Sequence, residues 1–220
     1  MGKRVGVLLS GCGYLDGSEI HETVLTLLFL NRAGASVVCL APSGDQRDVV
    51  NHQTADAVKE RREIIAEAAR ISRGNVRDVD EVEPKDLDAL ILPGGYGAVK
   101  NLCDFSVAGT LCTVHSGVER LIKGLHNSKK PLGFICIAPV LAAKVLGSSR
   151  PELTIGHDEA TATALEEIGA RHIPCNVDHI VVDSVNKIVS TPAYMLGPGI
   201  SEVASGIEKL VKQILLWVEN

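Results

Sequence analysis

Lys130-Pro131-Leu132-Gly133-Phe134-Ile135-Cys136-Ile137-Ala138-Pro139 is the stretch that decides the fold of this 220-residue chain. Its apolar run ends at Cys136 and predicts a buried strand. The apolar pattern over Ile137–Leu146 predicts a helix, and Gly147 is a typical stop signal just beyond it. A strand that turns straight into a helix holds the turning residue in a tight bend, with its side chain above the sheet edge. We therefore expect a nucleophile elbow at Cys136.

The residue at this bend has two interpretations. A helix N-terminus aimed at the Cys136 thiol would favour its thiolate form, which suits a catalytic nucleophile. Free cysteine is also among the most buried residue types, so a plain core position explains the same pattern. The stretch alone leaves both interpretations open.

The composition predicts an α/β domain that spans residues 1–220. Hydrophobic residues make up 45% of the chain and charged residues 22%, so we expect a large buried core. Because only 3% of the residues are aromatic, that core must consist of valine, leucine, isoleucine and alanine. Such residues suit parallel strands that are buried on both faces. The net charge of −5 disfavours nucleic acid as a partner.

The cysteines and the first apolar run indicate the compartment. The six cysteines are scattered without a C-x-x-C pair, which predicts neither a disulfide framework nor a zinc site. We therefore expect no bound metal and a reducing, cytoplasmic environment. The run Val5–Leu9 is too short for a signal peptide or a membrane span, so no membrane partner is expected.

Strand and helix patterns alternate along the chain. Strands are expected at Val5–Leu9, Val37–Pro42, a short edge segment within Val76–Pro84, Leu87–Leu92, Pro131–Cys136, Leu153–Gly156, Ile180–Asp183 and Lys187–Ser190. Helices are expected at Glu19–Arg32, Lys59–Ile71, Val118–His126, Ile137–Leu146, Glu159–Ile168 and Ile200–Val218. This alternation predicts a doubly wound sandwich that binds ligands at the carboxyl ends of its strands.

The helix over Glu19–Arg32 is apolar around most of its circumference, which predicts a buried helix. Its apolar residues are Ile20, Val24, Leu25, Leu27, Leu28 and Phe29. Asp16 or Ser18 is expected to cap it. Glu22 would then lie among apolar neighbours, where desolvation raises the pKa of a carboxyl and prepares it for proton transfer. The alternative is a surface acid that interacts with the helix dipole.

Two loops follow other strand ends. Pro93-Gly94-Gly95 offers backbone N–H groups that can approach a ligand closely, as an oxyanion hole requires, although an ordinary tight turn has the same sequence. Lys100-Asn101-Leu102 follows and is expected to line the same mouth. The glycine-rich loop Ser10–Gly17 lacks G-x-G-x-x-G spacing, which disfavours a dinucleotide site. Because these loops and Cys136 converge on one sheet edge, catalysis becomes the favoured interpretation.

Several motifs together resemble one family. They are Ser10-Gly11-Cys12-Gly13, Asp16-Gly17-Ser18-Glu19-Ile20-His21-Glu22, Pro93-Gly94-Gly95, Lys100-Asn101-Leu102, Cys136-Ile137-Ala138-Pro139 and Thr191-Pro192-Ala193-Tyr194-Met195. In order and spacing, over essentially the whole chain, they resemble the ElbB-type glyoxalase family. Its members are called isoprenoid biosynthesis proteins with an amidotransferase-like domain. They belong to the PfpI-type branch of the class I glutamine amidotransferase-like superfamily.

The resemblance implies a flavodoxin-like three-layer α/β sandwich with a mainly parallel central sheet. It implies that Cys136 is the nucleophile, that Glu22 is the buried acid contacting it, and that the amides of Gly95 and Ile137 form the oxyanion site. Gly94, Asn101 and His21 are the other oxyanion or substrate-binding candidates. The implied activity is a glyoxalase that needs no glutathione, metal or other cofactor and converts glyoxal to glycolate, a side activity of the physiological role. A homodimer is also implied.

The chain differs from amidotransferase and protease members in its histidines. Those members place a histidine directly after the nucleophile or supply one late in the chain. Here Ile137 follows Cys136, and we take His157 and His179 as the late candidates. Amide hydrolysis is therefore disfavoured. Two hypotheses remain: an enzyme acting on a small aldehyde, and a non-catalytic, redox-sensing protein in which Cys136 is oxidised.

Overall fold

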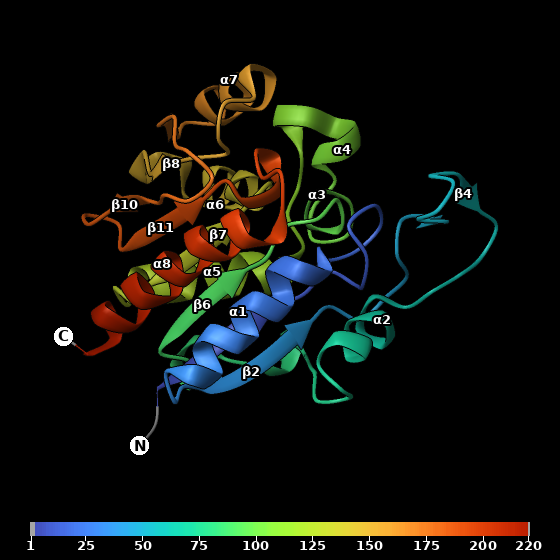
Figure 1. The fold of residues 1–220 in the computed structure, drawn as a ribbon, viewed down its shortest axis with the longest axis horizontal. Coiled ribbons are helices and arrows are strands. Elements are labelled where there is room, and N and C mark those ends of the chain that lie inside the picture. Colours follow the sequence, from blue (N-terminus) through green and yellow to red (C-terminus); the bar gives the residue numbers. More distant parts are fainter. Residues whose placement is uncertain (1–2, 220) are drawn as a thin grey trace.

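The computed structural model describes residues 3–219, and its centre is a seven-stranded sheet in the order β10-β11-β7-β6-β1-β2-β5 (Figure 1). The strands of this sheet are β1 Arg4–Leu8, β2 Ser36–Ala41, β5 Arg77–Asp78, β6 Ala89–Leu92, β7 Leu132–Ile135, β10 Val181–Asp183 and β11 Ile188–Thr191. Only β10 runs antiparallel to its neighbour β11, and the other pairs are parallel. The predicted mainly parallel sheet is confirmed.

Helices cover both faces of this sheet, which confirms the three-layer α/β sandwich (Figure 1). The helices are α1 Ile20–Arg32, α2 Ile64–Ile71, α3 Gly97–Lys100, α4 Phe105–Ala108, α5 Ser116–Asn127, α6 Pro139–Leu146, α7 Glu159–Glu167 and α8 Ile200–Glu219. On one face α1 and α8 lie side by side and α2 packs near β2, and on the other face α5 packs beside α6. No helix in the described range is long and apolar enough to cross a membrane.

The strand order fixes where a ligand can bind. The chain leaves β1 toward β2 on one side and returns to place β6 on the other side of β1. The loops at the carboxyl ends of β1 and β6 therefore diverge and leave a crevice, which is the usual ligand site of such sheets. Because β7 lies beside β6, the residue that follows β7, Cys136, comes to the same edge.

Side chains of β6 show how the core is divided between the two helical layers. Leu90 and Leu92 belong to the cluster that includes α5 and α6, and Ala89 and Ile91 belong to the cluster under α1 and α8. All four are fully buried, as expected for a parallel strand covered on both faces. Burying each large aliphatic side chain contributes about 1.5–3 kcal/mol, so the two layers hold the sheet firmly.

The prediction that α1 is a wholly buried helix is wrong. Ile20, Val24 and Leu28 form an exposed apolar stripe, and the buried face carries the polar Thr23 and Thr26 beside Glu22 and Leu30. These threonines tolerate burial because their hydroxyls donate hydrogen bonds to main-chain carbonyls one turn earlier, at distances of 2.8 and 2.7 Å. The inward side of the helix is therefore mixed, because Leu25, Leu27 and Phe29 pack partly buried against the core while Glu22 and the threonines are buried with Leu30.

The cap of α1 also differs from the prediction. Glu19 is the N-cap, and its side chain accepts a hydrogen bond from the Glu22 N–H at 2.7 Å. Ser18 instead accepts one from the Ser10 N–H, and Asp16 accepts one from the Val50 N–H, each at 2.8 Å. Both expected caps therefore hold the loops around α1 rather than the helix itself.

Two other segments depart from the predicted boundaries. The helix expected from Lys59 begins only at Ile64, because Glu63 forms a β-bridge with Asp45. The strand expected at Leu153–Gly156 is shorter, β8 Glu152–Leu153, and pairs with β9 Arg171–His172 outside the main sheet. A second small sheet, β3 Val49–Val50 with β4 Ala57–Val58, was not predicted. The β3–β4 hairpin extends away from the main sheet at one end of the molecule (Figure 1).

Candidate active site

Cys136 follows β7 directly and adopts a left-handed backbone conformation, with φ of 61°. A non-glycine residue in this region costs on the order of 1–3 kcal/mol, a strain that persists when the surroundings hold the residue in place. Here the Cys136 N–H donates a hydrogen bond to the Thr191 carbonyl at 2.9 Å. The tight bend predicted at Cys136 is therefore present. The helix after it, α6, begins later than expected, at Pro139.

Glu22 lies behind this cysteine and is completely buried. One carboxyl oxygen accepts a hydrogen bond from the Gly94 N–H at 2.8 Å, and the other accepts one from the Tyr194 N–H at 3.3 Å. The carboxyl is also hydrogen-bonded to the Cys136 side chain. Burial, and secondarily the charge of Glu19, raises the pKa of Glu22 to about 8. The prediction of a buried acid with a raised pKa is confirmed, and the surface alternative is wrong.

The sulfur of Cys136 has three polar neighbours. The backbone N–H groups of Gly95 and Ile137 donate hydrogen bonds to it, and the Glu22 carboxyl is the third. Burial, followed by the negative charge of Glu22, raises the pKa of the Cys136 thiol, and the two amides oppose this in part. We expected the bend to favour the thiolate, and the direction is the reverse because burial outweighs the amide dipoles. Cys136 and Glu22 thus titrate as a pair.

Gly94 and Gly95 lie so close to neighbouring atoms that neither position has room for a side chain. A Cβ added to Gly94 would lie 2.4 Å from the Cys136 Cβ and 2.8 Å from a Glu22 carboxyl oxygen. Gly95 has φ of 91°, and a Cβ there would lie 2.4 Å from the Gly17 carbonyl oxygen. Any side chain at either position would therefore displace the acid, the cysteine or the loop after β1.

A cavity of about 370 Å³ opens above the sulfur. It is lined by Tyr14, Glu19, Gly95, Tyr96, Cys136, Ile137, Asp158, Thr161, Tyr194 and Met195. Of the candidates from the sequence, Cys136, Gly95 and Ile137 line this cavity, and Glu22 and Gly94 lie directly behind the sulfur. The tyrosines and Asp158 were not among those candidates. A signal existed for the tyrosines, because each follows a predicted strand by a few residues.

Two other candidates lie outside this cavity. The Asn101 side-chain amide donates hydrogen bonds to the carbonyls of Ser10 and Asp16, both at 2.8 Å, and so supports the loop after β1. His21 is exposed on α1, and its Nδ1 lies 2.7 Å from the hydroxyl of Tyr194. Asn101 can therefore affect the cavity only through the loop after β1, and His21 only through Tyr194.

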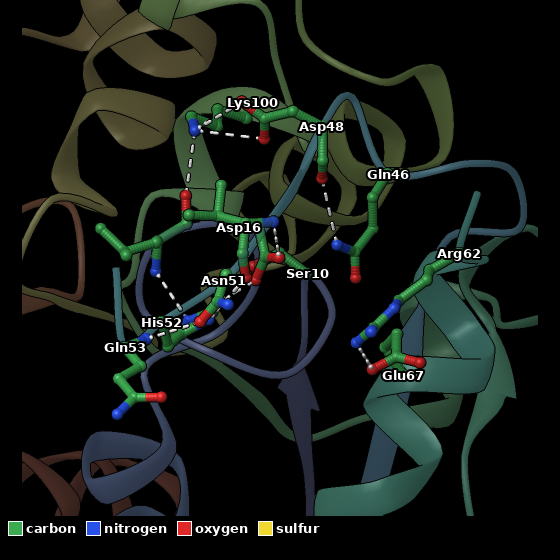
Figure 2. Close-up of polar contacts among 12 residues, drawn as sticks. Ser10, Asp16, Gln46, Asp48, Asn51, His52, Gln53, Arg62, Glu67 and Lys100 are labelled. Carbon is green, nitrogen blue, oxygen red and sulfur yellow. Dashed lines mark hydrogen bonds and ion pairs between the residues drawn. The ribbon is translucent and has the colours of Figure 1, made fainter. Parts of the chain in front are cut away.

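A second polar cluster supports the same loop from its other side (Figure 2). The Lys100 ammonium donates a hydrogen bond to the Leu15 carbonyl at 2.9 Å and pairs with Asp48 at 2.9 Å. The expectation that Lys100 lines the cavity is therefore wrong. Asp16 and Gln46 are buried there, and each has one side-chain oxygen without a hydrogen-bond partner. Nearby, Glu67 is buried and pairs with Arg62 and Arg70.

Histidines lie away from the sulfur. No histidine lines the cavity over Cys136, and His157 and His179 line a different one. A Cys-His-acid triad is thus not assembled within the described residues. Residues 3–219 also contain no group of three His, Cys, Asp or Glu side chains placed to hold a metal ion, and all six cysteines are free thiols. The groups in contact with the Cys136 sulfur are one carboxyl and two backbone amides.

Comparisons with known proteins place this chain in a family. No family model matches the chain. The rat (Rattus norvegicus) "ES1 protein homolog, mitochondrial" is 42% identical over 222 residues, covering 96% of this chain and 83% of that protein. The human (Homo sapiens) "Glutamine amidotransferase-like class 1 domain-containing protein 3, mitochondrial" is 41% identical and covers 96% and 82%, respectively.

Two solved structures are also similar to this chain. The isoprenoid biosynthesis protein with amidotransferase-like domain from Ehrlichia chaffeensis superposes with a TM-score of 0.90 and 33% identity, over 97% of this chain and 99% of that one. Schizosaccharomyces pombe DJ-1 shares the fold, with a TM-score of 0.58 and 20% identity over 96% of this chain and 91% of that one. The chain therefore belongs to the ES1 and ElbB-type family of class I glutamine amidotransferase-like proteins.

Proposed function

We propose that this protein is a glutathione-independent glyoxalase that converts glyoxal to glycolate, as a side activity of its physiological role. The observation that supports this most is the Cys136–Glu22 pair. It combines a nucleophile with a carboxyl whose pKa of about 8 lets it both give and take a proton near neutral pH. The reaction needs these two groups and an oxyanion site, and it needs no histidine.

The first step is addition of the Cys136 sulfur to one carbonyl carbon of glyoxal. A C–S bond forms, and the carbonyl oxygen takes up a proton, giving a hemithioacetal. The amides of Gly95 and Ile137 already point at the sulfur, so they are placed beside the oxygen on which negative charge develops. Glu22 supplies the proton.

The second step is an internal redox reaction. Ionised Glu22 removes the proton from the carbon attached to sulfur and delivers it to the neighbouring carbonyl carbon, while the hydroxyl proton on the first carbon passes to the oxygen of the second. The first carbon is oxidised to a thioester and the second is reduced to a hydroxymethyl group, so no external oxidant or reductant is needed. Water then hydrolyses the thioester, which releases glycolate and restores the Cys136 thiol.

A second candidate function is redox sensing by the same cysteine. The supporting observation is that Glu22, protonated below about pH 8, lies within hydrogen-bonding distance of the Cys136 sulfur. A carboxylic acid in that position donates to the oxygen of an oxidised sulfur and stabilises a sulfinic acid. Intact mass after mild peroxide, with peptide mapping, would show a gain of two oxygens at Cys136, together with negligible glyoxal turnover.

The homodimer and the compartment also remain proposals. The exposed stripe of Ile20, Val24 and Leu28 on α1 is apolar enough to be covered by a second copy of the chain. Sedimentation of the wild type and of Val24→Glu tests this, since a monomeric wild type would contradict it. The rat and human relatives are named as mitochondrial proteins. We propose a reducing compartment, which six free thiols require.

The decisive experiment measures glycolate formed from glyoxal without glutathione. Cys136→Ala should lower turnover to the uncatalysed background, because no other thiol lines the cavity. Cys12→Ala is the matched control, since Cys12 lies outside the cavity, and it should keep full turnover. Undiminished turnover in Cys136→Ala would refute the proposal.

A further inference from the structure

The tyrosines of this chain are gathered in one place. The sequence contains three tyrosines, and all three line the cavity over Cys136. They come from the loops after three different strands, with Tyr14 after β1, Tyr96 after β6 and Tyr194 after β11. Aromatic residues make up only 3% of the chain, so this grouping does not follow from composition.

Basic side chains hold two of these rings from outside the cavity. The ring of His52 meets the ring of Tyr14 edge-on, with centroids 5.4 Å apart. The Lys100 ammonium lies 5.8 Å from the centre of the Tyr96 ring. Lys100 is itself paired with Asp48 at 2.9 Å, so its positive charge is compensated on the outer side (Figure 2). Both rings are about half exposed and keep surface available to the cavity.

The third ring is held more tightly. Ala193 has φ of 45°, a strained conformation for a residue with a side chain. This turn directs the Tyr194 N–H to Glu22, while the Tyr194 hydroxyl contacts His21 Nδ1 at 2.7 Å. Tyr194 is therefore fixed at both ends, by its backbone and by its hydroxyl.

Two carboxylates complete the wall. Glu19 caps α1, and Asp158 caps α7 by accepting a hydrogen bond from the Thr161 N–H at 2.8 Å. Neither forms an ion pair with a lysine or arginine anywhere in residues 3–219. No lysine, arginine or histidine lines the cavity. The wall thus presents aromatic faces and negative charge, and no charge of the opposite sign.

The size of the cavity also exceeds what glyoxal needs. Its volume of about 370 Å³ lies in the ~300–1,000 Å³ range of pockets for larger organic ligands. Tyrosine faces attract cations through their negative quadrupole, and nearby carboxylates add to this attraction. An anionic substrate would be repelled by Glu19 and Asp158.

We propose that the cavity over Cys136 is an organic-cation site, and that the substrate is a carbonyl compound with a protonated or quaternary ammonium group. The carbonyl part of this proposal rests on the proposed function. The cation-binding part does not, because it concerns only the wall of the cavity. The two parts can therefore fail separately.

Calorimetric binding of choline to the resting wild-type protein tests the cation site. The control ligand is 3,3-dimethylbutan-1-ol, which has the same shape as choline but no charge. Choline should bind about tenfold more tightly than this alcohol, which is the gain expected for a desolvated cation on aromatic rings. Equal binding of the two, or no binding of choline, would overturn the proposal.

The rate at which charged reagents label Cys136 is a second, independent test of the cation site. Two methanethiosulfonate reagents of similar size are compared, one with a trimethylammonium group and one with a sulfonate group. Relative to their rates with free N-acetylcysteine amide, the cationic reagent should label Cys136 about tenfold faster than the anionic one. A ratio no larger than that of the free thiol would contradict the cation site. Because labelling needs no turnover, a failed glyoxalase assay does not affect this result.

Variants of Glu19 and Asp158 test whether these two carboxylates cause the preference for cations. The double change Glu19→Gln with Asp158→Asn keeps both helix caps, since the amide oxygens still accept the same bonds. It should reduce the labelling ratio several-fold and weaken choline binding. The matched control is Glu167→Gln, an exposed acid on α7 that does not line the cavity, and it should change neither. A double variant with an unchanged ratio would overturn the role of the two carboxylates.

Discussion

Glu22 and Asp16 are two buried acids at the same edge of the sheet, and each has a cysteine in its electrostatic surroundings. Glu22 is hydrogen-bonded to Cys136, and the charge of Asp16 acts on Cys12. Both acids are almost inaccessible to solvent, at 0% and 3%. On burial and residue type alone, the two acids are equivalent.

Their surroundings differ in charge. Glu22 receives only two main-chain N–H bonds and has no cationic side chain beside it, so burial dominates and the pKa of its carboxyl is about 8. Asp16 accepts from the Val50 N–H, and its other oxygen lies 3.7 Å from His52 (Figure 2). The first acid can exchange a proton near neutral pH, and the second is placed to hold two loops together.

The surroundings of the two cysteines differ as well. Cys136 is buried but lines the tyrosine-lined cavity, whereas Cys12 is partly exposed and lies outside it. Cys136 also occupies a strained backbone position, with φ of 61°, and Cys12 is not among the non-glycine residues with positive φ. The comparison teaches that a buried acid and a thiol become a candidate site only where the acid is electrostatically isolated and the sulfur faces a cavity.

The largest expected effect is the loss of catalysis when Glu22 is replaced. Glu22→Gln keeps the shape of the side chain but removes the proton donor and acceptor, so kcat for glyoxal should fall by roughly 10²–10⁴-fold. Steady-state glycolate production measures this. A loss of less than about tenfold would mean that Glu22 only positions the sulfur, and the contrast with Asp16 would disappear.

The second effect is on stability. Because the folded-state pKa of Glu22, about 8, lies above the usual 4.5, the folded protein holds a proton that the unfolded chain releases. The stability that this provides is complete below pH 4.5 and is lost as the pH rises through about 8. The loss is about 5 kcal/mol between these limits. Glu22→Gln should remove this pH-dependent loss of stability.

Urea unfolding at pH 5 and pH 9 measures this difference. Other groups titrate in both proteins, so the quantity to compare is the change between the two pH values in wild type and in Glu22→Gln. Equal changes in the two proteins would show that Glu22 is already ionised at pH 5, against the burial argument.

The third effect is the pH dependence of turnover. The reactive form of the pair carries one proton, whichever group holds it. Below pH 8 the pair carries two protons, so kcat/KM for glyoxal should rise about tenfold per pH unit and level off above about 8. Stopped assays between pH 5.5 and 9 in a constant-ionic-strength buffer measure this. A profile that falls with pH would contradict the assignment.

The sequence predicted the fold because strand periodicity, helix stop signals and the strand–helix junction at Cys136 all indicate the same sandwich. It predicted Glu22 for a reason that was only partly correct. The apolar residues of α1 suggested a buried helix, but Ile20 and Val24 are exposed, and Glu22 is buried on the mixed inward side of the helix. Local patterning cannot determine which side faces inward, since that depends on what α1 meets at the sheet edge.

The cavity wall was harder to predict for a physical reason. Tyr14 and Tyr96 lie in loops and Tyr194 lies in a single 3-10 turn, Ala193–Met195, and none of these segments has a periodicity that indicates which way a side chain points. Their convergence depends on the strand order, which brings distant loops together. The thiol pKa was predicted in the wrong direction because the sequence shows the helix that follows Cys136 but not how deeply the sulfur is buried.

The smallest expected effect is on the second acid. In Asp16→Asn the side-chain oxygen can still accept from the Val50 N–H, and the new amide N–H faces His52 Nε2, which already accepts from the Leu15 N–H. Stability should therefore change by no more than about 1 kcal/mol, whereas Asp16→Ala leaves the Val50 donor unpaired and costs about 1–3 kcal/mol. Thermal unfolding and glyoxal assays on both variants measure this. If Asp16→Asn lost turnover as Glu22→Gln does, the two acids would act as one site, because support of a loop alone does not require a negative charge.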